Sequence, residues 1–226
     1  FGTRRVGCEL TIRFVGLGQS QIDQTMEDHV QLPDDVTLSS QFQGSRVDFT
    51  FSLPGHAAED LARLERLKTE LHTHLDDAIY ADDAQTTLEQ SVVDLLAGRG
   101  EKAALVEIGS GGSLTAGFGQ TKDVAEVLAG AFVAPDAKKM QELLEIREER
   151  PSNIPGDKDV VLLARTASKK TNAAWVVVVG AVEDDPSSKN SFATVAFKHP
   201  NGQIEVWSAQ VPGSNASALA HLTTQI

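Results

Sequence analysis

The sequence predicts an α/β protein of two domains, an α+β unit over residues 1–84 and a layered α/β unit over residues 85–226. In the first part, segments with strand alternation and segments with helical spacing follow one another in the order β-α-β-β-α. In the second part, strand and helix patterns alternate along the chain, which is typical of α/β layers. The run "WVVVVGAV" from Trp175 is apolar without alternation, as expected for a strand buried on both faces.

The elements of the first unit follow from their apolar spacing. The segment "CELTIRFVGL" reads as a strand, and "SQIDQTMEDHV" reads as a short helix. Residues 36–53 read as a hairpin, because apolar and polar residues alternate in its second arm. A helix follows from His56, and its apolar face is formed by five leucines at helical spacing: Leu61, Leu64, Leu67, Leu71 and Leu75.

The second unit begins after the junction "YADDAQTT". A helix, "TLEQSVVDLLAG", starts there with Thr87 and Gln90 as a capping box. We then expect the strand "KAALVEI", a glycine turn, a short helix, the apolar segment "VAEVLAGAFVA", two further helices and the strand from Trp175. A hairpin with the turn "HPNG" and a closing helix from Gly213 complete the chain.

Composition and charge limit the class of protein. The net charge is −12, and residues 1–85 hold 15 acidic and 7 basic side chains, which argues against nucleic acid as a partner. The longest apolar run falls far short of the roughly 20 residues of a membrane span. Cys8 is alone, so it forms no internal disulfide, and we expect a buried thiol and a cytoplasmic protein. Because the sequence begins with Phe1, we expect it to be part of a longer chain.

The stretch "EIGSGGS" from Glu107 is the first candidate site. Backbone N–H groups of Gly109, Ser110, Gly111 and Gly112 could bind an anion at a helix N-terminus. A tight turn with a capping serine is the other reading. The letters also match the G-x-x-G loop of KH domains, but that loop joins two helices, whereas this one follows a strand.

A nucleophile is the second possibility for the same stretch. Ser110 or Ser113 would need a base, and Lys138 and Lys139 are the candidates in the next loop or helix start. The alternative is that both lysines are solvated beside Asp136. His72 and His74 lie two residues apart on a helix and diverge, so we expect no metal site and no cofactor.

The order of these pieces resembles the CinA family of competence-damage inducible proteins. The resemblance rests on "LTIRFVGLGQSQIDQ" and "AIYADDAQTTLEQSVVDLLAGRGEKAALVEIGSGGSLTAGF", and it covers essentially the whole chain. It implies a KH-like middle domain over 1–84, a C-terminal deamidase-type domain over 85–226 and a homo-oligomer. Full-length members also carry an N-terminal molybdopterin-binding-like domain with ADP-ribose pyrophosphatase activity.

The resemblance also implies a reaction and the residues for it. Active relatives hydrolyse the amide of nicotinamide mononucleotide with the serine of an "ESCTGG" loop, assisted by the lysine and tyrosine of "YSNEAK". A "GIAGP" loop and a "PGDR" segment help to hold the nucleotide. In this sequence the nucleophilic serine falls on Ile108, the cysteine on Gly109 and the threonine on Ser110, whereas Glu107, Gly111 and Gly112 match.

The other motifs depart from the family pattern as well. The tyrosine falls near Ala134 or Pro135, and the lysine is Lys138 or is lost. "GIAGP" has become "GAVED" from Gly180, and the arginine of "PGDR" is Asn215. We therefore expect a domain that has lost catalysis and is retained as a structural, oligomerising or ligand-binding module. The alternatives are an amidohydrolase with a relocated serine and a module that binds a pyridine nucleotide without turnover.

Overall fold

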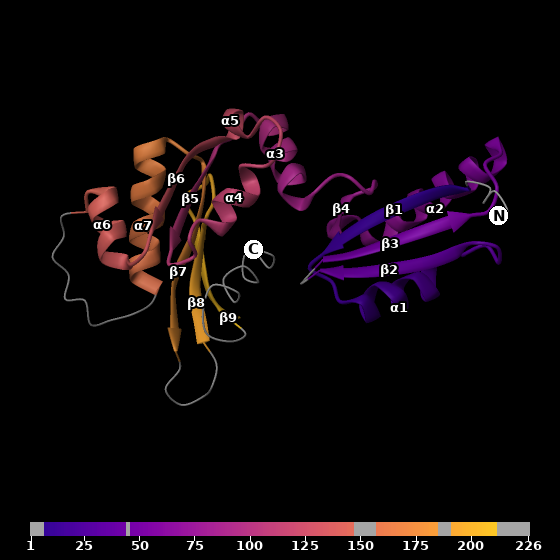
Figure 1. The fold of residues 1–226 in the computed structure, drawn as a ribbon, viewed down its shortest axis with the longest axis horizontal. Helices are drawn as coiled ribbons and strands as arrows, with labels where there is room; N and C mark the ends of the chain where they lie inside the picture. Colours follow the sequence, from indigo (N-terminus) through magenta and orange to yellow (C-terminus); the bar gives the residue numbers. More distant parts are fainter. Residues whose placement is uncertain (1–6, 44–45, 147–156, 185–190, 212–226) are drawn as a thin grey trace, which may run out of the picture. The chain divides into compact units, whose positions relative to one another are not determined.

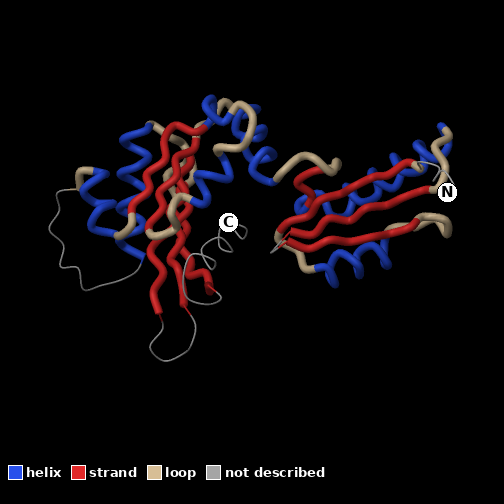
Figure 2. The backbone as a smooth tube through the Cα atoms, viewed as in Figure 1, coloured by secondary structure: helices blue, strands red, loops and turns tan. Residues whose placement is uncertain are grey.

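The computed structural model describes residues 7–43, 46–146, 157–184 and 191–211, which form two compact units (Figure 1). One unit ends at Ser91 and the other begins at Val92, inside a helix. Each unit combines a sheet with helices, so the α/β fold class is confirmed (Figure 2). The boundary that we expect between residues 84 and 85 precedes this division by seven residues and stays a prediction.

The first unit contains the expected β-α-β-β-α order and one further strand. Its four-stranded sheet has the order β2-β3-β1-β4, and neighbouring strands are antiparallel. This is the split β-α-β arrangement. The elements are β1 (Cys8–Val15), α1 (Gln19–His29), β2 (Thr37–Gln43), β3 (Arg46–Leu53), α2 (Ala58–Leu75), the 3-10 turn η1 (Asp76–Ala78) and β4 (Ile79–Ala81).

Helices α1 and α2 cover one face of this sheet, and the core lies between them. Phe14 and Phe49 meet edge to face with ring centroids 5.8 Å apart. Cys8 is a buried free thiol, as expected. Four of the five predicted leucines of α2 are buried, but Leu61 is 47% exposed. The prediction was wrong at Leu61, because it lies in the first turn of α2, outside the core that its four partners join.

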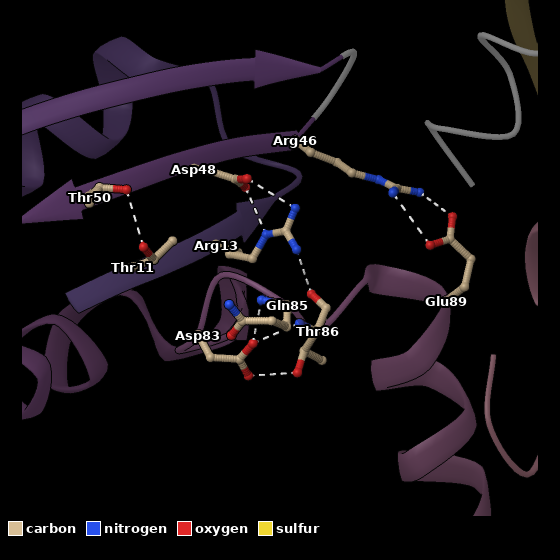
Figure 3. A network of polar contacts seen from close by, with 9 residues as sticks. All are labelled: Thr11, Arg13, Arg46, Asp48, Thr50, Asp83, Gln85, Thr86 and Glu89. Carbon is tan, nitrogen blue, oxygen red and sulfur yellow. Dashed lines mark hydrogen bonds and ion pairs between the residues drawn. The ribbon is translucent and has the colours of Figure 1, made fainter. Parts of the chain in front are cut away.

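The other face of the sheet is polar and binds the segment that follows β4 (Figure 3). Arg13 forms an ion pair with Asp48 at 3.0 Å and donates to the carbonyl of Thr86 at 2.7 Å. Arg46 forms an ion pair with Glu89 at 2.6 Å. We call these five residues the connector network, since they join the sheet to the chain that leads into the next helix.

The second unit is a five-stranded sheet with the order β6-β5-β7-β8-β9. Strand β5 is parallel to both β6 and β7, whereas β7, β8 and β9 are antiparallel. Its elements are α3 (Leu88–Arg99, whose first four residues fall in the first unit), β5 (Ala103–Ile108), α4 (Ser113–Phe118), α5 (Val124–Val127), β6 (Leu128–Ala134), α6 (Ala137–Leu144), α7 (Asp157–Thr171), β7 (Trp175–Asp184), β8 (Ser191–Lys198) and β9 (Ile204–Val211).

Helices cover both faces of this sheet. Helices α6 and α7 pack on one face, and α3 and α4 lie on the other (Figure 1). Alternate residues of β7 therefore enter different cores, for example Val178 on one side and Val179 on the other. The apolar run without alternation is confirmed as a strand buried on both faces.

Two smaller expectations have clear outcomes. The Thr87 hydroxyl accepts from the N–H of Gln90 at 3.1 Å, so Thr87 is confirmed as the cap of α3. The turn "HPNG" is confirmed between β8 and β9, where the N–H of Gly202 donates to the carbonyl of His199 at 3.0 Å.

The closing helix from Gly213 lies outside the described residues. No helix in the described ranges has the length and apolar character to cross a membrane.

Candidate functional site

The glycine turn lies at the carboxyl ends of the parallel strands. It leaves β5 for α4 on one face of the sheet, whereas the neighbouring strand β6 leads to α6 on the other face. In α/β sheets, ligands bind outside the strand ends at such a divergence. The N–H of Gly109 donates to the carbonyl of Ala134 at 2.9 Å, which fixes the turn beside the end of β6. The fold thus places "EIGSGGS" where a binding site is expected.

A buried carboxylate occupies the start of helix α4. Glu107 is fully buried at the end of β5 and accepts four hydrogen bonds. Ser110 Oγ donates at 2.6 Å, the backbone N–H groups of Leu114 and Thr115 donate at 3.1 and 2.8 Å, and Thr115 Oγ1 donates at 2.5 Å. A helix N-terminus favours negative charge. The chain itself therefore supplies the anion to this helix start.

The glycines allow the turn a left-handed backbone conformation, which is strained for residues with a Cβ atom. Gly109, Gly111 and Gly112 have φ angles of 75°, 67° and 83°, in the left-handed region. A Cβ at Gly112 would also lie 3.4 Å from the side chain of Val133. This pattern explains the glycine content of the stretch by backbone geometry.

The two candidate serines have different surroundings. The hydroxyl of Ser110 donates to Glu107 and accepts from the N–H of Gly112 at 3.2 Å. Ser113 is the first residue of α4, and its Oγ is buried with no hydrogen-bond partner among the described residues. Ser110 therefore helps to hold the turn.

The two candidate lysines lie on α6 and are both exposed. The backbone N–H of Lys139 donates to the capping residue Asp136 at 2.8 Å, and its Nζ donates to Glu142 at 2.7 Å. That bond raises the pKa of Lys139, the opposite of what a general base needs. In the ranges that the structure describes, no hydrogen bond joins either lysine to Ser110 or Ser113.

A small cavity of about 70 Å³ lies beside Ile108, the position of the family serine. Ile108 is 3% exposed and packs in the core between the sheet and helices α6 and α7. Pockets for drug-sized ligands usually measure about 300–1,000 Å³. The described residues that line the cavity are Ile108, Ala137, Gln141, Asp159, Val160, Leu163, Gly180, Ala181, Glu183 and Thr194.

The strand that carries "GAVED" is irregular at this cavity. The register between β7 and β8 shifts between Val179 and Val182, so Gly180 and Ala181 form a bulge. A Cβ at Gly180 would lie 2.8 Å from the carbonyl oxygen of Thr194. Glycine is therefore required there by the close approach of β8. Asn215 lies outside the described residues.

The histidines of α2 bind other side chains. His72 Nδ1 lies 2.6 Å from Asp76, and the ring of His74 stacks on His29 with centroids 4.6 Å apart. Within the described segments, no three His, Cys, Asp or Glu side chains are grouped as a metal site would require.

The role of Glu107 could not be read from the sequence. The one signal in the sequence is a carboxylate near the end of an otherwise apolar strand. A buried carboxylate needs several hydrogen-bond donors, so its position indicates that donors lie nearby. Its partners follow three to eight residues later, across a turn whose shape the residue spacing does not reveal.

No protein-family model matches the chain. It is similar to a putative competence-damage inducible protein of Oceanobacillus iheyensis, with 22% identity over 172 residues, which cover 76% of this chain and 40% of that protein. A CinA-like protein of Dictyoglomus thermophilum is 26% identical over 139 residues, covering 61% of this chain and 34% of its own length. The chain thus spans less than half the length of these curated relatives.

The fold of this chain is similar to that of solved structures of competence/damage inducible proteins. The competence/damage inducible protein CihA from Agrobacterium tumefaciens matches 61% of this chain and 87% of its own, with a TM-score of 0.54 and 13% identity. At that identity the match supports the fold alone.

Proposed function

Because this chain belongs to the CinA family of competence-damage inducible proteins, we propose that its second unit is a pyridine-nucleotide deamidase-type domain that has lost catalysis. The domain is retained as a module that supports a homo-oligomer or binds a ligand. We also propose a cytoplasmic location, which the buried free thiol of Cys8 supports. The net charge of −12 supports the proposal that nucleic acid is not a partner.

Ile108 is the observation that carries this proposal. The resemblance places the attacking serine at this position, and a hydrocarbon side chain has no oxygen with which to attack an amide carbon. Removal of a catalytic nucleophile typically forfeits most of the rate. The isoleucine is also part of the core, since it is 3% exposed, so the position now contributes to packing.

The surroundings of Ile108 support the same conclusion. The adjacent cavity of about 70 Å³ is several times smaller than common ligand pockets. Two acidic side chains, Asp159 and Glu183, line it, and they would repel the phosphate of a mononucleotide. The donors at the start of α4 are bound to Glu107, so they contribute little to anion recognition.

One observation favours the alternative of an active amidohydrolase with a relocated serine. Ser110 Oγ lies 2.6 Å from a carboxylate oxygen of Glu107, and a carboxylate can accept a proton from a hydroxyl nucleophile. The same carboxylate accepts three further hydrogen bonds from the start of α4, so its oxygens already serve to hold the turn. We therefore place this alternative second.

An ammonia-release assay with nicotinamide mononucleotide separates the two functions. We expect no release above the buffer rate by the purified chain, with a CinA-family protein that retains the "ESCTGG" loop as the positive control. Release that disappears in Ser110→Ala but persists in Ser113→Ala would establish the relocated serine and overturn the proposal. Thermal unfolding with the same nucleotide tests for binding without turnover, which would raise the transition temperature.

A further inference from the structure

Strand β2 forms one edge of the sheet in the first unit. It pairs with β3 along its whole length, from Thr37 opposite Ser52 to Gln43 opposite Arg46. In the part of the chain that the structure describes, no strand pairs with its other side. An edge strand offers unpaired N–H and C=O groups to any further strand that approaches it.

This edge lacks the features that usually protect an edge strand. The sequence "TLSSQFQ" from Thr37 contains no lysine, no proline and no charged residue, although the chain carries 32 acidic and 20 basic side chains. The register with β3 shifts at no position, so no bulge turns the edge away. Natural sheets block unwanted strand pairing with such charges, prolines and bulges.

The strand also exposes two large apolar side chains on one face. Leu38 and Phe42 lie opposite the buried residues Phe51 and Val47 of β3, so both belong to the face that the helices cover. They are nevertheless 37% and 56% exposed, because they lie at the margin of that core. Ser40 lies between them and is opposite Phe49.

We propose that β2 pairs antiparallel with β2 of a second copy of this chain, about a two-fold axis at Ser40. This register places Leu38 of each copy opposite Phe42 of the other, so the two exposed apolar side chains cover each other twice. It joins two four-stranded sheets into one of eight strands.

The lack of charge along β2 points to a second copy as the occupant. Two copies of a chain with a net charge of −12 repel each other in general, and an uncharged strand adds no like-charge contact of its own to an interface. The spacing of Leu38 and Phe42 about Ser40 is also self-complementary, as a two-fold interface requires. A seven-residue strand pair covers less than the roughly 1,200 Å² of a stable interface, so we expect weak association that depends on concentration.

Two single-cysteine substitutions test the register. In the proposed dimer, residue 40 of one copy faces residue 40 of the other. The two Cα atoms are then about 4.5–5.5 Å apart, a distance that a disulfide can span. Residue 39 faces Gln41 of the other copy, and its own counterpart is about 8 Å away, too far for a disulfide. Upon mild oxidation we expect Ser40→Cys to form a covalent dimer and Ser39→Cys to stay monomeric. The native chain is the blank, because Cys8 is buried.

Sedimentation velocity at about 100 μM tests the interface itself, since a Kd on the order of 10 μM would make the chain mostly dimeric there. We expect Phe42→Asp to shift the chain to monomer, because it places a negative charge opposite Leu38. Leu143→Asp, at an exposed leucine on α6, also replaces an apolar side chain by a carboxylate and should leave the dimer intact. Circular dichroism confirms that both variants are folded.

The outcomes separate this interface from the homo-oligomer of the proposed function, on which it rests. A monomer at every concentration would overturn both. A dimer that resists Phe42→Asp, or that cross-links as well through Ser39→Cys as through Ser40→Cys, would overturn the β2 interface and leave the oligomer standing.

Discussion

Glu107 is the residue on which the glycine turn depends most. Its carboxylate accepts bonds from one hydroxyl of the turn, one hydroxyl of α4 and two backbone N–H groups, with no solvent to replace them. Glu107→Gln keeps the shape but replaces one acceptor oxygen by a donor that faces other donors. We expect a loss of about 1–3 kcal/mol in the free energy of unfolding.

Urea unfolding followed by tryptophan fluorescence measures this loss, because Trp175 and Trp207 both lie in the second unit. Glu126→Gln on α5 is the matched control, since that carboxylate is exposed and should cost less than about 0.5 kcal/mol. Equal effects of the two substitutions would show that Glu107 does not hold the turn.

At the scale of single residues, the sequence predicts which side chains are buried better than it predicts which groups they contact. The burial of Leu64, Leu67, Leu71 and Leu75 follows from helical spacing, because one face of α2 meets the sheet. The partners of Glu107 do not follow from spacing, since they depend on three left-handed glycines. The roles proposed for Ser110, Ser113, Lys138 and Lys139 stay predictions, and the ammonia-release assay addresses those of the two serines.

The start of helix α3 is anchored to strand β3 by an ion pair. Arg46 and Glu89 are 12% and 22% exposed, and the guanidinium donates to both carboxylate oxygens, at 2.6 and 3.5 Å. Burial raises the pKa of Glu89 and is the largest single effect. The hydrogen bond and positive charge of Arg46, a hydrogen bond from the backbone N–H of Glu89 and one from Thr87 together outweigh burial and hold the pKa below its ordinary value of 4.5. A lowered pKa in the folded state means that the charged form of Glu89 stabilises the fold.

Glu89→Gln should therefore lower the free energy of unfolding by about 1–2 kcal/mol at neutral pH. The stabilisation is fully present above the unfolded pKa of 4.5 and is lost as pH falls through the lower folded pKa. Urea unfolding of both proteins from pH 7 to pH 3, followed by circular dichroism, should show the two curves converge at the acid end.

A surface pair provides the control for this pH dependence. Glu142 binds Lys139 with both side chains at least half exposed, so Glu142→Gln should change stability by less than about 0.5 kcal/mol at neutral pH. A difference between wild type and Glu89→Gln that stays constant down to pH 3 would contradict the charge-based explanation.

Elements were predictable where the apolar pattern was long or regular, and less so where it was short. The segment "VAEVLAGAFVA" contains α5 (Val124–Val127) and β6 (Leu128–Ala134), and a short apolar run cannot by itself be divided into helix and strand. Strand β4 has three residues, too few for any alternation, and it exists because β1 offers it an edge. Tertiary pairing decides such elements.

At the scale of the whole molecule, the division into two units makes the expected boundary testable. A chain that ends at residue 84 lacks Thr86 and Glu89. The two arginines of the sheet, Arg13 and Arg46, then each lose a partner. A fragment of residues 1–99 keeps both, together with the bond from Ser91 Oγ to the carbonyl of Tyr80 at 2.7 Å.

We therefore expect the 1–99 fragment to unfold with a free energy about 1–3 kcal/mol higher than the 1–84 fragment, measured in urea by circular dichroism. The longer fragment with Arg46→Met is the control, and it should lose most of the difference. Equal stability of the two fragments would favour the boundary at 84/85 and assign the connector network no role in the first unit.

The internal cap at Glu107 has a consequence for how this domain could change over evolutionary time. In many phosphate-binding loops the ligand is the anion that the helix start needs, so the loop and its ligand are maintained together. Here the strand provides that anion, and the turn keeps its shape whether or not anything binds. Selection on chemistry can then lapse without unfolding the domain, and the preserved outline of such a loop in a relative is no evidence that the relative still turns over a substrate.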